Sequence, residues 1–357
     1  MKRILRILFV LFLLALIALG GTAYWFYKDL HTPLTHNKAS RYVEIKHGST
    51  PAAVARKLAS EGIIRHEWPF MWYMKFTGAG ARIKAGDYKF PSPITPLAAL
   101  QKLEQGEQRM IRLTIIEGWT RWDIANAMSK IPELGLSDSS AALTLMDDVS
   151  LIKQLDPDAS NLEGYIYPDT YDFPPNSTPK AVIDMMVKRF LSVWGNSCAN
   201  VPRPATITPK QIVTIASLIE TEAKLSEERT LVASVIYNRL QKNIPLGVDS
   251  SIIYASKLAG KWRNDGKVYK SDVERDSPYN TRIHQGLPPG PIASPSESSL
   301  KAAVVPAKTN YIYYVREPSR NDGAHNFYDN GNDFEKGVQA LRRWEQQRDA
   351  RNNHAYR

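Results

Sequence analysis

Residues 7–27 contain no charged side chain, and Leu, Ile, Phe, Val and Ala dominate the segment. These 21 residues, at about 1.5 Å rise per residue, form a helix of roughly 30 Å, which is long enough to cross the hydrocarbon core of a bilayer. The sequence therefore predicts a single transmembrane helix within residues 1–27. The remaining residues, about 330 of them, then fold outside the membrane.

The flanks of this span predict its orientation. Lys2, Arg3 and Arg6 precede it, and the positive-inside rule keeps such a short basic segment in the cytoplasm. Tyr24–Tyr27 closes it as an aromatic belt at the far interface. A cleaved signal peptide is the alternative, and Gly21–Ala23 leaves it open, but the apolar run exceeds the usual ~7–15 residues. We expect a single-pass membrane protein with a cytoplasmic N-terminus and the remainder on the far side of the membrane.

Composition limits the classes open to that remainder. Over the chain, 43% of residues are hydrophobic and 23% charged, as in globular proteins, and the length favours two or three domains. The single cysteine, Cys198, cannot form an internal disulfide. No metal-ligand spacing or glycine-rich phosphate loop is present, so neither a metal nor a cofactor is predicted. The net charge is +10, and its scattered basic residues argue against nucleic acid as a partner. Such a charge suits anionic lipid headgroups and peptide carboxylates, and solubility alone is the alternative.

A strand–turn–helix pattern occurs twice in the front part of the chain. Residues 42–46 and residues 112–116 read as strands, and a helix pattern follows each of them. Between strand and helix stand a glycine and, two residues later, a threonine (Gly48 and Thr50; Gly118 and Thr120). A glycine turn and a hydroxyl N-cap account for this arrangement. The opening resembles the LysM module, which binds N-acetylglucosamine-containing glycans.

The first copy of the pattern is the more complete one. Pro69–Phe76 supplies a second helix and Ala85–Phe90 a second strand, which predicts a LysM-like βααβ module. A βα unit without any glycan contact is the alternative. Trp68, Trp72 and Tyr73 are able to stack on sugars, although aromatic residues at helical spacing more often belong to a core.

The segment Thr208–Ala223 predicts an apolar helix with two glutamates at its end. Thr208 fits the N-cap, and Gln211 stands where a capping-box partner belongs. Glu220 and Glu222 lie about 80° to either side of the apolar stripe. A carboxyl group beside a packed apolar face loses solvation, so its pKa rises and it suits a general acid. Two solvated glutamates at a helix end are the alternative, and periodicity does not choose between Glu220 and Glu222.

Several further motifs occur in a characteristic order around this helix. They are Leu162–Tyr171 before it and Val235–Leu240, Pro245–Tyr254, Ser277–Thr281 and Gly286–Ala293 after it. This ordered set resembles the YceG-like family, the membrane-anchored endolytic murein transglycosylases. In that family the catalytic glutamate is the first acidic residue of an Ala-Ser-hydrophobic-hydrophobic-Glu-x-Glu pattern. The resemblance therefore assigns the role to Glu220.

The resemblance implies lytic chemistry with one carboxyl group. The glutamate protonates the glycosidic oxygen of a MurNAc–GlcNAc β-1,4 bond and then deprotonates the C6 hydroxyl of the same MurNAc, which closes a 1,6-anhydro ring. Glu163 and Asp169, in the first motif, are expected to organise a loop against the catalytic part. The predicted substrate-binding residues are Asn238, Asp249, Tyr254, Tyr279, Asn280 and His325, each weighed against a purely structural role.

The predicted fold class is α+β: one N-terminal transmembrane helix, the LysM-like module, and a mixed α+β catalytic domain. The predicted boundaries are 1–27 for the anchor, 28–40 for a linker, 41–105 for the LysM-like module, 106–205 for a connecting α/β region, 206–345 for the catalytic domain and 346–357 for a polar tail. The resemblance implies termination of nascent glycan strands and partnership with peptidoglycan synthases. Two alternatives stay open: a muramidase-type hydrolase with Asp249 or Glu222 as second carboxylate, and a non-enzymatic cell-wall-binding scaffold.

Overall fold

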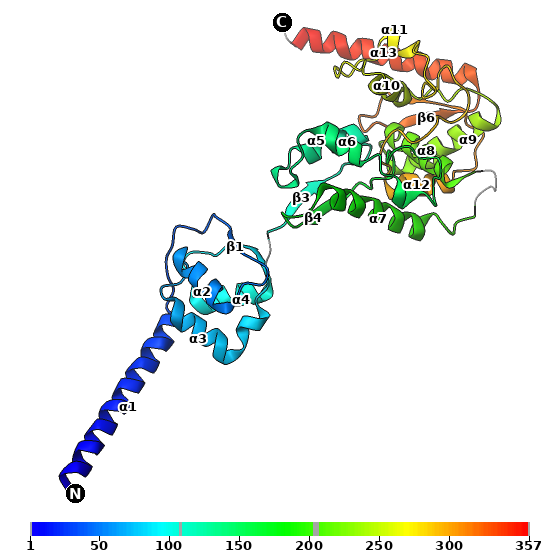
Figure 1. Ribbon diagram of the computed structural model, residues 1–357. Helices are drawn as coiled ribbons and strands as arrows, with labels where there is room; N and C mark the ends of the chain where they lie inside the picture. Colours follow the sequence, from blue (N-terminus) through cyan, green and yellow to red (C-terminus); the bar gives the residue numbers. More distant parts are fainter. Residues whose placement is uncertain (1, 107–108, 203–206, 356–357) are drawn as a thin grey trace. The chain divides into compact units, whose positions relative to one another are not determined.

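The computed structural model describes residues 2–106, 109–202 and 207–355. The chain forms two compact units, Met1–Ile111, here called the anchor unit, and Arg112–Arg357, here called the large unit (Figure 1). Within the described residues, helices predominate and the strands form two-stranded sheets, so the α+β prediction is confirmed. The predicted boundary between residues 205 and 206 and the last two residues of the predicted tail lie outside the described residues. The finer domain boundaries stay predictions.

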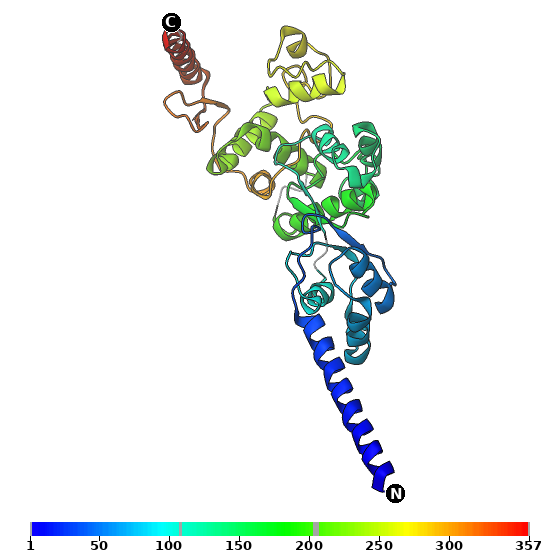
Figure 2. The ribbon, with the colours of Figure 1, turned by 90° about the vertical axis from the view of Figure 1, so that its left-hand side faces the viewer.

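The anchor unit begins with the apolar helix that the sequence predicts. Helix α1 spans Lys2–His31, and its segment Arg6–His31 is long and apolar enough to cross a membrane. The side chains of this segment are largely exposed, as expected for a helix without protein around it. Figures 1 and 2 show α1 as one continuous helix that runs into the rest of its unit. Its last turn is tied there, because Leu30 is buried in the core of the anchor unit.

The rest of the anchor unit has the predicted βααβ order. Strand β1 (Val43–Ile45) pairs antiparallel with β2 (Gly86–Tyr88), and α2 (Pro51–Ser60) and α3 (Glu67–Thr77) lie between them in the chain. The short helix η1 (Ala79–Arg82) and helix α4 (Pro96–Gln105) complete the unit.

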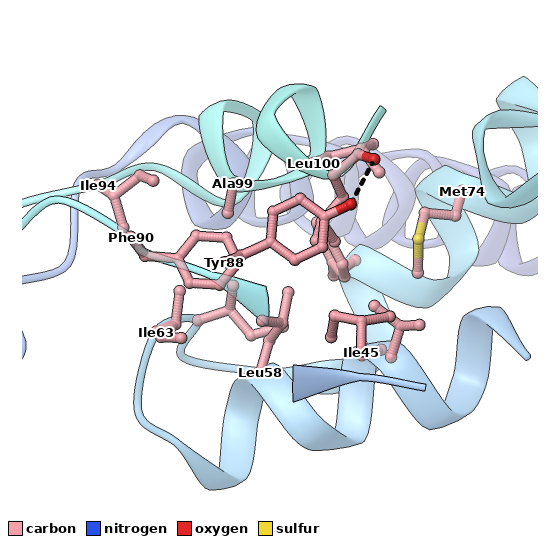
Figure 3. Close-up of a cluster of buried hydrophobic side chains, with 14 of the residues drawn as sticks. Ile45, Leu58, Ile63, Met74, Tyr88, Phe90, Ile94, Ala99 and Leu100 are labelled. Carbon is pink, nitrogen blue, oxygen red and sulfur yellow. Dashed lines mark hydrogen bonds between the residues drawn. The ribbon is translucent and has the colours of Figure 1, made fainter. Parts of the chain in front are cut away.

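The core of the anchor unit is built around two aromatic side chains. Tyr88 and Phe90 are each 1% exposed. Figure 3 shows them between α4, at Ala99, and the residues Leu58 and Ile63. The Tyr88 hydroxyl donates a 2.6 Å hydrogen bond to a backbone carbonyl, which satisfies its polar end inside the core.

Both copies of the strand–turn–helix pattern have the predicted geometry. Gly48 and Gly118 adopt φ values of 77° and 78°, in the left-handed region that favours glycine. The Thr50 hydroxyl caps α2, and the Thr120 hydroxyl caps α5 (Arg121–Ser129). The repeated local structure is therefore confirmed, whereas glycan binding by the first copy stays a prediction.

The large unit holds the remaining elements. They are β3 (Ile111–Thr114, with its first residue at the boundary), α5, η2 (Pro132–Leu134), α6 (Ser139–Leu145), η3 (Ser150–Ile152), β4 (Thr170–Phe173), α7 (Pro179–Ser197), α8 (Pro209–Glu222), η4 (Ser226–Glu228), α9 (Arg229–Gln241), α10 (Asp249–Leu258), α11 (Lys270–Val273), α12 (Glu297–Val304), β5 (Tyr313–Arg316), β6 (His325–Tyr328) and α13 (Gly331–Ala355). Strand β3 pairs with β4, and β5 pairs antiparallel with β6.

Helix α8 is the central element of the large unit. Its residues from Ile212 to Ile219 are all buried, and it packs against α12, α9 and α10. It begins as predicted: the Thr208 hydroxyl accepts from the Gln211 backbone, and the Gln211 side chain accepts from the Thr208 backbone. It ends at Glu222, where the following residue Ala223 turns to an extended conformation. The capping box thus fixes the start of the helix that carries both glutamates.

Candidate active site

Helix α8 ends with two glutamates whose side chains meet different parts of the fold. Glu220 contacts residues that open α9 and α12. Glu222 contacts a tyrosine of β5 and a serine of α10. Residues two apart on a helix point about 200° apart, so this divergence follows from the spacing alone.

Glu220 is held by donors within the fold, and only 4% of its side chain is exposed. Its Oε1 accepts a 2.9 Å hydrogen bond from the Arg229 guanidinium. Its Oε2 accepts from the backbone N–H of Ser296, at 2.7 Å, and from the Ser296 hydroxyl. Ser296 is the N-cap of α12, where a negative charge is favoured. Both carboxyl oxygens of Glu220 therefore accept hydrogen bonds from the protein.

Glu222 is half-buried, and the hydrogen bonds to its two carboxyl oxygens differ in length. The Tyr314 hydroxyl donates to Oε2 at 2.8 Å, whereas the Ser250 hydroxyl reaches Oε1 only at 3.4 Å. Burial raises the pKa of Glu222, and the neighbouring Asp249 carboxylate raises it further, while Tyr314, His325 and Ser250 act in the opposite direction. A raised pKa and one weakly held oxygen are the properties that a general acid needs.

Asp249 and His325, two of the predicted substrate-binding residues, influence Glu222 electrostatically. Asp249 is the first residue of α10; its side chain is 61% exposed, and Arg282 binds it at 2.6 Å. His325 is the first residue of β6 and lies 2.8 Å from the carboxyl group of Glu228. The fold thus brings together residues from α8, α10 and β6 that lie far apart in the sequence.

The other predicted substrate-binding residues are engaged in the fold. Asn280 is fully buried, and its amide donates to two backbone carbonyls. Asn238 donates to two carbonyls in the segment before β5. Tyr254 is 3% exposed and donates to Glu163, and the half-buried Tyr279 packs on its ring. Asn280 and Tyr254 are thus buried with their polar groups engaged by the protein, and a substrate-binding role for these four residues stays a prediction. Asn238 and Tyr279 keep part of their surface accessible.

Tyr314, Arg229 and Ser296 are important contacts that the sequence analysis does not identify. Burial raises the pKa of Tyr314 well above its usual value, so its hydroxyl stays a donor toward Glu222. Arg229 and Ser296 meet Glu220 from 9 and 76 residues away. No local spacing signals such long-range pairs. Across the part of the chain that the structure describes, no three His, Cys, Asp or Glu residues are grouped to hold a metal ion.

Glu163 and Asp169 have the organising contacts expected of them. Glu163 is buried and accepts from the backbone N–H of Arg121, the first residue of α5, and from Tyr254 of α10. Burial raises the pKa of Glu163 to about 7. Asp169 pairs with Arg189 of α7 at 2.9 Å. The first motif thus ties α5, α7 and α10 together.

The chain matches a known protein family. The model of the YceG-like family matches residues 43–340. The chain belongs to the YceG-like family. This confirms the resemblance that the ordered motifs indicated.

The relatives of the chain agree with this assignment. It is 35% identical over 312 residues to a protein of Bacillus subtilis (strain 168) named endolytic murein transglycosylase, covering 83% of this chain and 84% of the relative. It is 28% identical over 347 residues to a protein of the same name from Streptococcus pneumoniae (strain ATCC BAA-255 / R6), covering 89% of this chain but 62% of that relative. The crystal structure of a yceG-like protein from Listeria monocytogenes matches with a TM-score of 0.54 and 30% identity, covering 83% of this chain and 98% of the other.

Proposed function

We propose that this chain is an endolytic peptidoglycan transglycosylase, a lyase that cleaves MurNAc–GlcNAc β-1,4 bonds within glycan strands and leaves 1,6-anhydroMurNAc ends. Membership of the family and the names of its relatives support the reaction class. The observation that carries the chemistry is the half-buried Glu222 carboxyl group, whose Oε2 is held by Tyr314 at 2.8 Å and whose Oε1 has only the 3.4 Å contact to Ser250.

The family pattern assigns the general acid to Glu220, whereas the contacts of the two carboxyl groups favour Glu222, and the mechanism below is written for Glu222. An acid must bring a carboxyl oxygen within hydrogen-bond reach of the substrate oxygen, and an oxygen with few protein donors reaches it without first losing a bond. Both oxygens of Glu220 are taken up by Arg229 and Ser296. Oε1 of Glu222 has only the long contact to Ser250. The assignment of Glu220 stays a prediction, and the paired variants described in the Discussion decide between the two.

The reaction then needs no second carboxyl group and no water. As the bond between C1 of MurNAc and the bridging oxygen breaks, that oxygen takes the proton of Glu222. The resulting carboxylate accepts the proton of the C6 hydroxyl, which regenerates the acid. The C6 oxygen then bonds to C1 and closes the 1,6-anhydro ring. Intramolecular attack has a high effective molarity, so the ring closes without an activated water molecule.

The neighbours of Glu222 suit these two steps. The Tyr314 hydroxyl holds Oε2 and leaves Oε1 to face the substrate. The exposed carboxylate of Asp249 supplies negative charge near the oxocarbenium-like centre that develops at C1. His325, fixed by Glu228, packs edge-on against the Tyr314 ring at 5.4 Å and so limits its movement.

A hydrolase with two carboxyl groups is the second candidate. The observation that favours it is the influence of the Asp249 carboxylate on the pKa of Glu222, which requires the two groups to be neighbours. In that case one residue would protonate the bond and the other would activate water or attack C1. The end groups of the products separate the two mechanisms.

The test is mass spectrometry of fragments released from purified glycan strands by the whole protein. Strand fragments ending in anhydroMurNAc support the lytic reaction. Fragments with reducing ends would replace it by hydrolysis. Absence of any cleavage by a folded protein would favour the third reading, a scaffold that binds the cell wall.

We also propose the placement of the protein in the cell. The apolar helix α1 supports a single-pass anchor, and the basic residues before it support a cytoplasmic N-terminus with the large unit in the periplasm, at the inner membrane. The βααβ order of residues 41–105 supports a LysM-like module that binds glycan weakly. Terminating nascent strands beside peptidoglycan synthases fits an anchored endolytic enzyme, because new strands emerge at the membrane.

A further inference from the structure

Helix α3 carries an exposed aromatic stripe on the face that points away from the core. Trp68, Trp72 and Phe76 recur at every fourth residue and are 42%, 38% and 78% exposed. The opposite face is buried through Phe70 and Met74. Residues four apart lie on one side of a helix, so the three rings form a continuous apolar surface. Large aromatic side chains are rarely left in water in this way without a binding partner.

This stripe begins beside the end of the apolar span of α1. The Trp68 ring stacks on Trp25 with centroids 5.0 Å apart and planes 18° apart, and it lies 6.1 Å from Phe26. His66, just before α3, is hydrogen-bonded to the largely buried Asp29 of α1 at 2.8 Å. The start of α3 is therefore fixed to the turn of α1 that forms the predicted aromatic belt.

A groove runs between α1 and the start of α3. It has a volume of about 710 Å³ and is lined by Ala18, Gly21, Thr22 and Trp25 of α1 and by His66 and Trp68. Three of the four α1 residues of this lining, Ala18, Gly21 and Thr22, are small, and Trp25 closes its end. The groove extends along α1 from Ala18, within the apolar span, to Trp25, at the aromatic rings. A lipid acyl chain extends over the same range of depths in a bilayer.

We propose that the aromatic stripe of α3 lies in the interface of the same bilayer that α1 crosses, with a lipid acyl chain in the groove. The inference rests on the proposed membrane anchor. Indole and phenyl rings concentrate at the boundary between headgroups and acyl chains, and amphipathic helices lie about 5–10 Å deep there. Lys75, whose ammonium lies 4.9 Å from the Trp72 ring centroid, is placed to reach anionic headgroups.

A lipid surface explains the stripe better than a glycan does. The rings stack on one another, Trp72 on Phe76 at 5.3 Å, and so present edges and an apolar ridge in place of a flat platform. Trp68 itself stacks on Trp25, at the end of the apolar span of α1. The βααβ part of the anchor unit is then held flat against the membrane, and its exposure to water is limited to its other faces.

The experiment uses the full chain reconstituted in lipid vesicles, with a polarity-sensitive fluorophore on one introduced cysteine. The variants are Phe76→Cys on the stripe, Glu44→Cys on the exposed face of β1 as the matched control, and Leu16→Cys within the span. Figure 1 shows β1 at the end of its unit away from α1. The native Cys198 is fully buried, and unsubstituted protein gives its labelling background. Spin-labelled lipids quench emission at either a shallow or a deep position.

We expect the label at residue 76 to have blue-shifted emission and to be quenched by the shallow lipid. The label at residue 16 should be quenched by the deep lipid, and that at residue 44 by neither. Quenching at 16 with water-like emission at 76 would refute the docking while the anchor stands. No quenching at 16 would remove the anchor and this inference together. A label at 76 that ignores lipid but shifts with soluble glycan fragments would identify the stripe as a sugar surface instead.

Discussion

Glutamine in place of each glutamate of α8 separates the acid from its neighbour. Glu222→Gln keeps the volume of the side chain and still accepts the hydrogen bond from Tyr314, but it has no proton to donate to the substrate. General acid–base assistance is typically worth about 10²–10⁴-fold, and we expect a loss at the upper end because one residue serves both steps.

The two glutamine variants should also differ in thermal stability. Because the folded-state pKa of Glu222 is raised, its ionised form is disfavoured in the fold, and any stability from this group is lost as the pH rises. Glu222→Gln should therefore melt at the same temperature as the native protein, or higher, at neutral pH.

Glu220→Gln leaves Arg229, whose side chain is 10% exposed, without its main counter-charge. Breaking such a pair costs about 3–5 kcal/mol, and the lower end applies here because Glu117 remains 3.7 Å away. At about 2–4 °C per kcal/mol for a unit of this size, a cost of about 3 kcal/mol lowers the melting temperature by roughly 6–12 °C.

The assay measures release of soluble fragments from purified glycan strands and thermal unfolding of the same preparations. Glu222→Gln should be inactive and stable, and Glu220→Gln should be destabilised but active below its own transition. If Glu220→Gln is inactive with an unchanged melting temperature while Glu222→Gln still cleaves, the general acid is Glu220 and not Glu222. Complete losses in both, with neither destabilised, would point to two carboxyl groups in the chemistry.

Further predictions follow from the same contacts. Activity should fall on the alkaline side as Glu222 loses its proton. Asp249 raises the pKa of Glu222 and Tyr314 lowers it, so Asp249→Asn should move this alkaline limb to lower pH and Tyr314→Phe to higher pH. Profiles of kcat/KM against pH measure both shifts, and shifts in the same direction would contradict this electrostatic account. The pKa of Glu163 is raised to about 7 by burial, so native stability should decline between about pH 4.5 and about pH 7, and Glu163→Gln should remove this decline in thermal melts. Cell fractionation should recover the protein in the membrane with its N-terminus intact, whereas a soluble form starting near Ala23 or Tyr24 would show cleavage.

Features set by neighbouring residues are predictable from the sequence. The capping box of Thr208 and Gln211 joins groups three residues apart, so residue type and spacing alone are enough to predict it. The Gly48 and Gly118 turns follow for the same reason, since a left-handed conformation selects glycine. These local rules locate α8 and the repeated strand–turn–helix units to within a residue or two.

The partners of each side chain across the fold are not predictable in this way. Periodicity places Glu220 beside an apolar stripe, but it does not reveal that Arg229 and Ser296 meet it there. Asn280 and Tyr254 look suited to a sugar by residue type, yet one is fully buried and the other 3% exposed. Residue type gives the chemistry available to a side chain, and only packing decides whether a substrate reaches it.

The two glutamates acquire distinct roles from this packing. A helix end frays easily, and α8 closes with one backbone hydrogen bond, from the N–H of Ala223 to the carbonyl of Ile219. The bonds from Glu220 to Arg229 and to Ser296 of α12 fasten the last turn to two other helices. Since Glu222 follows two residues later, its direction is fixed by that fastening, and Tyr314 then holds one oxygen. The Glu-x-Glu spacing thus gives each glutamate its own partners: those of Glu220 fasten the helix end, and in the proposed mechanism Glu222 reacts.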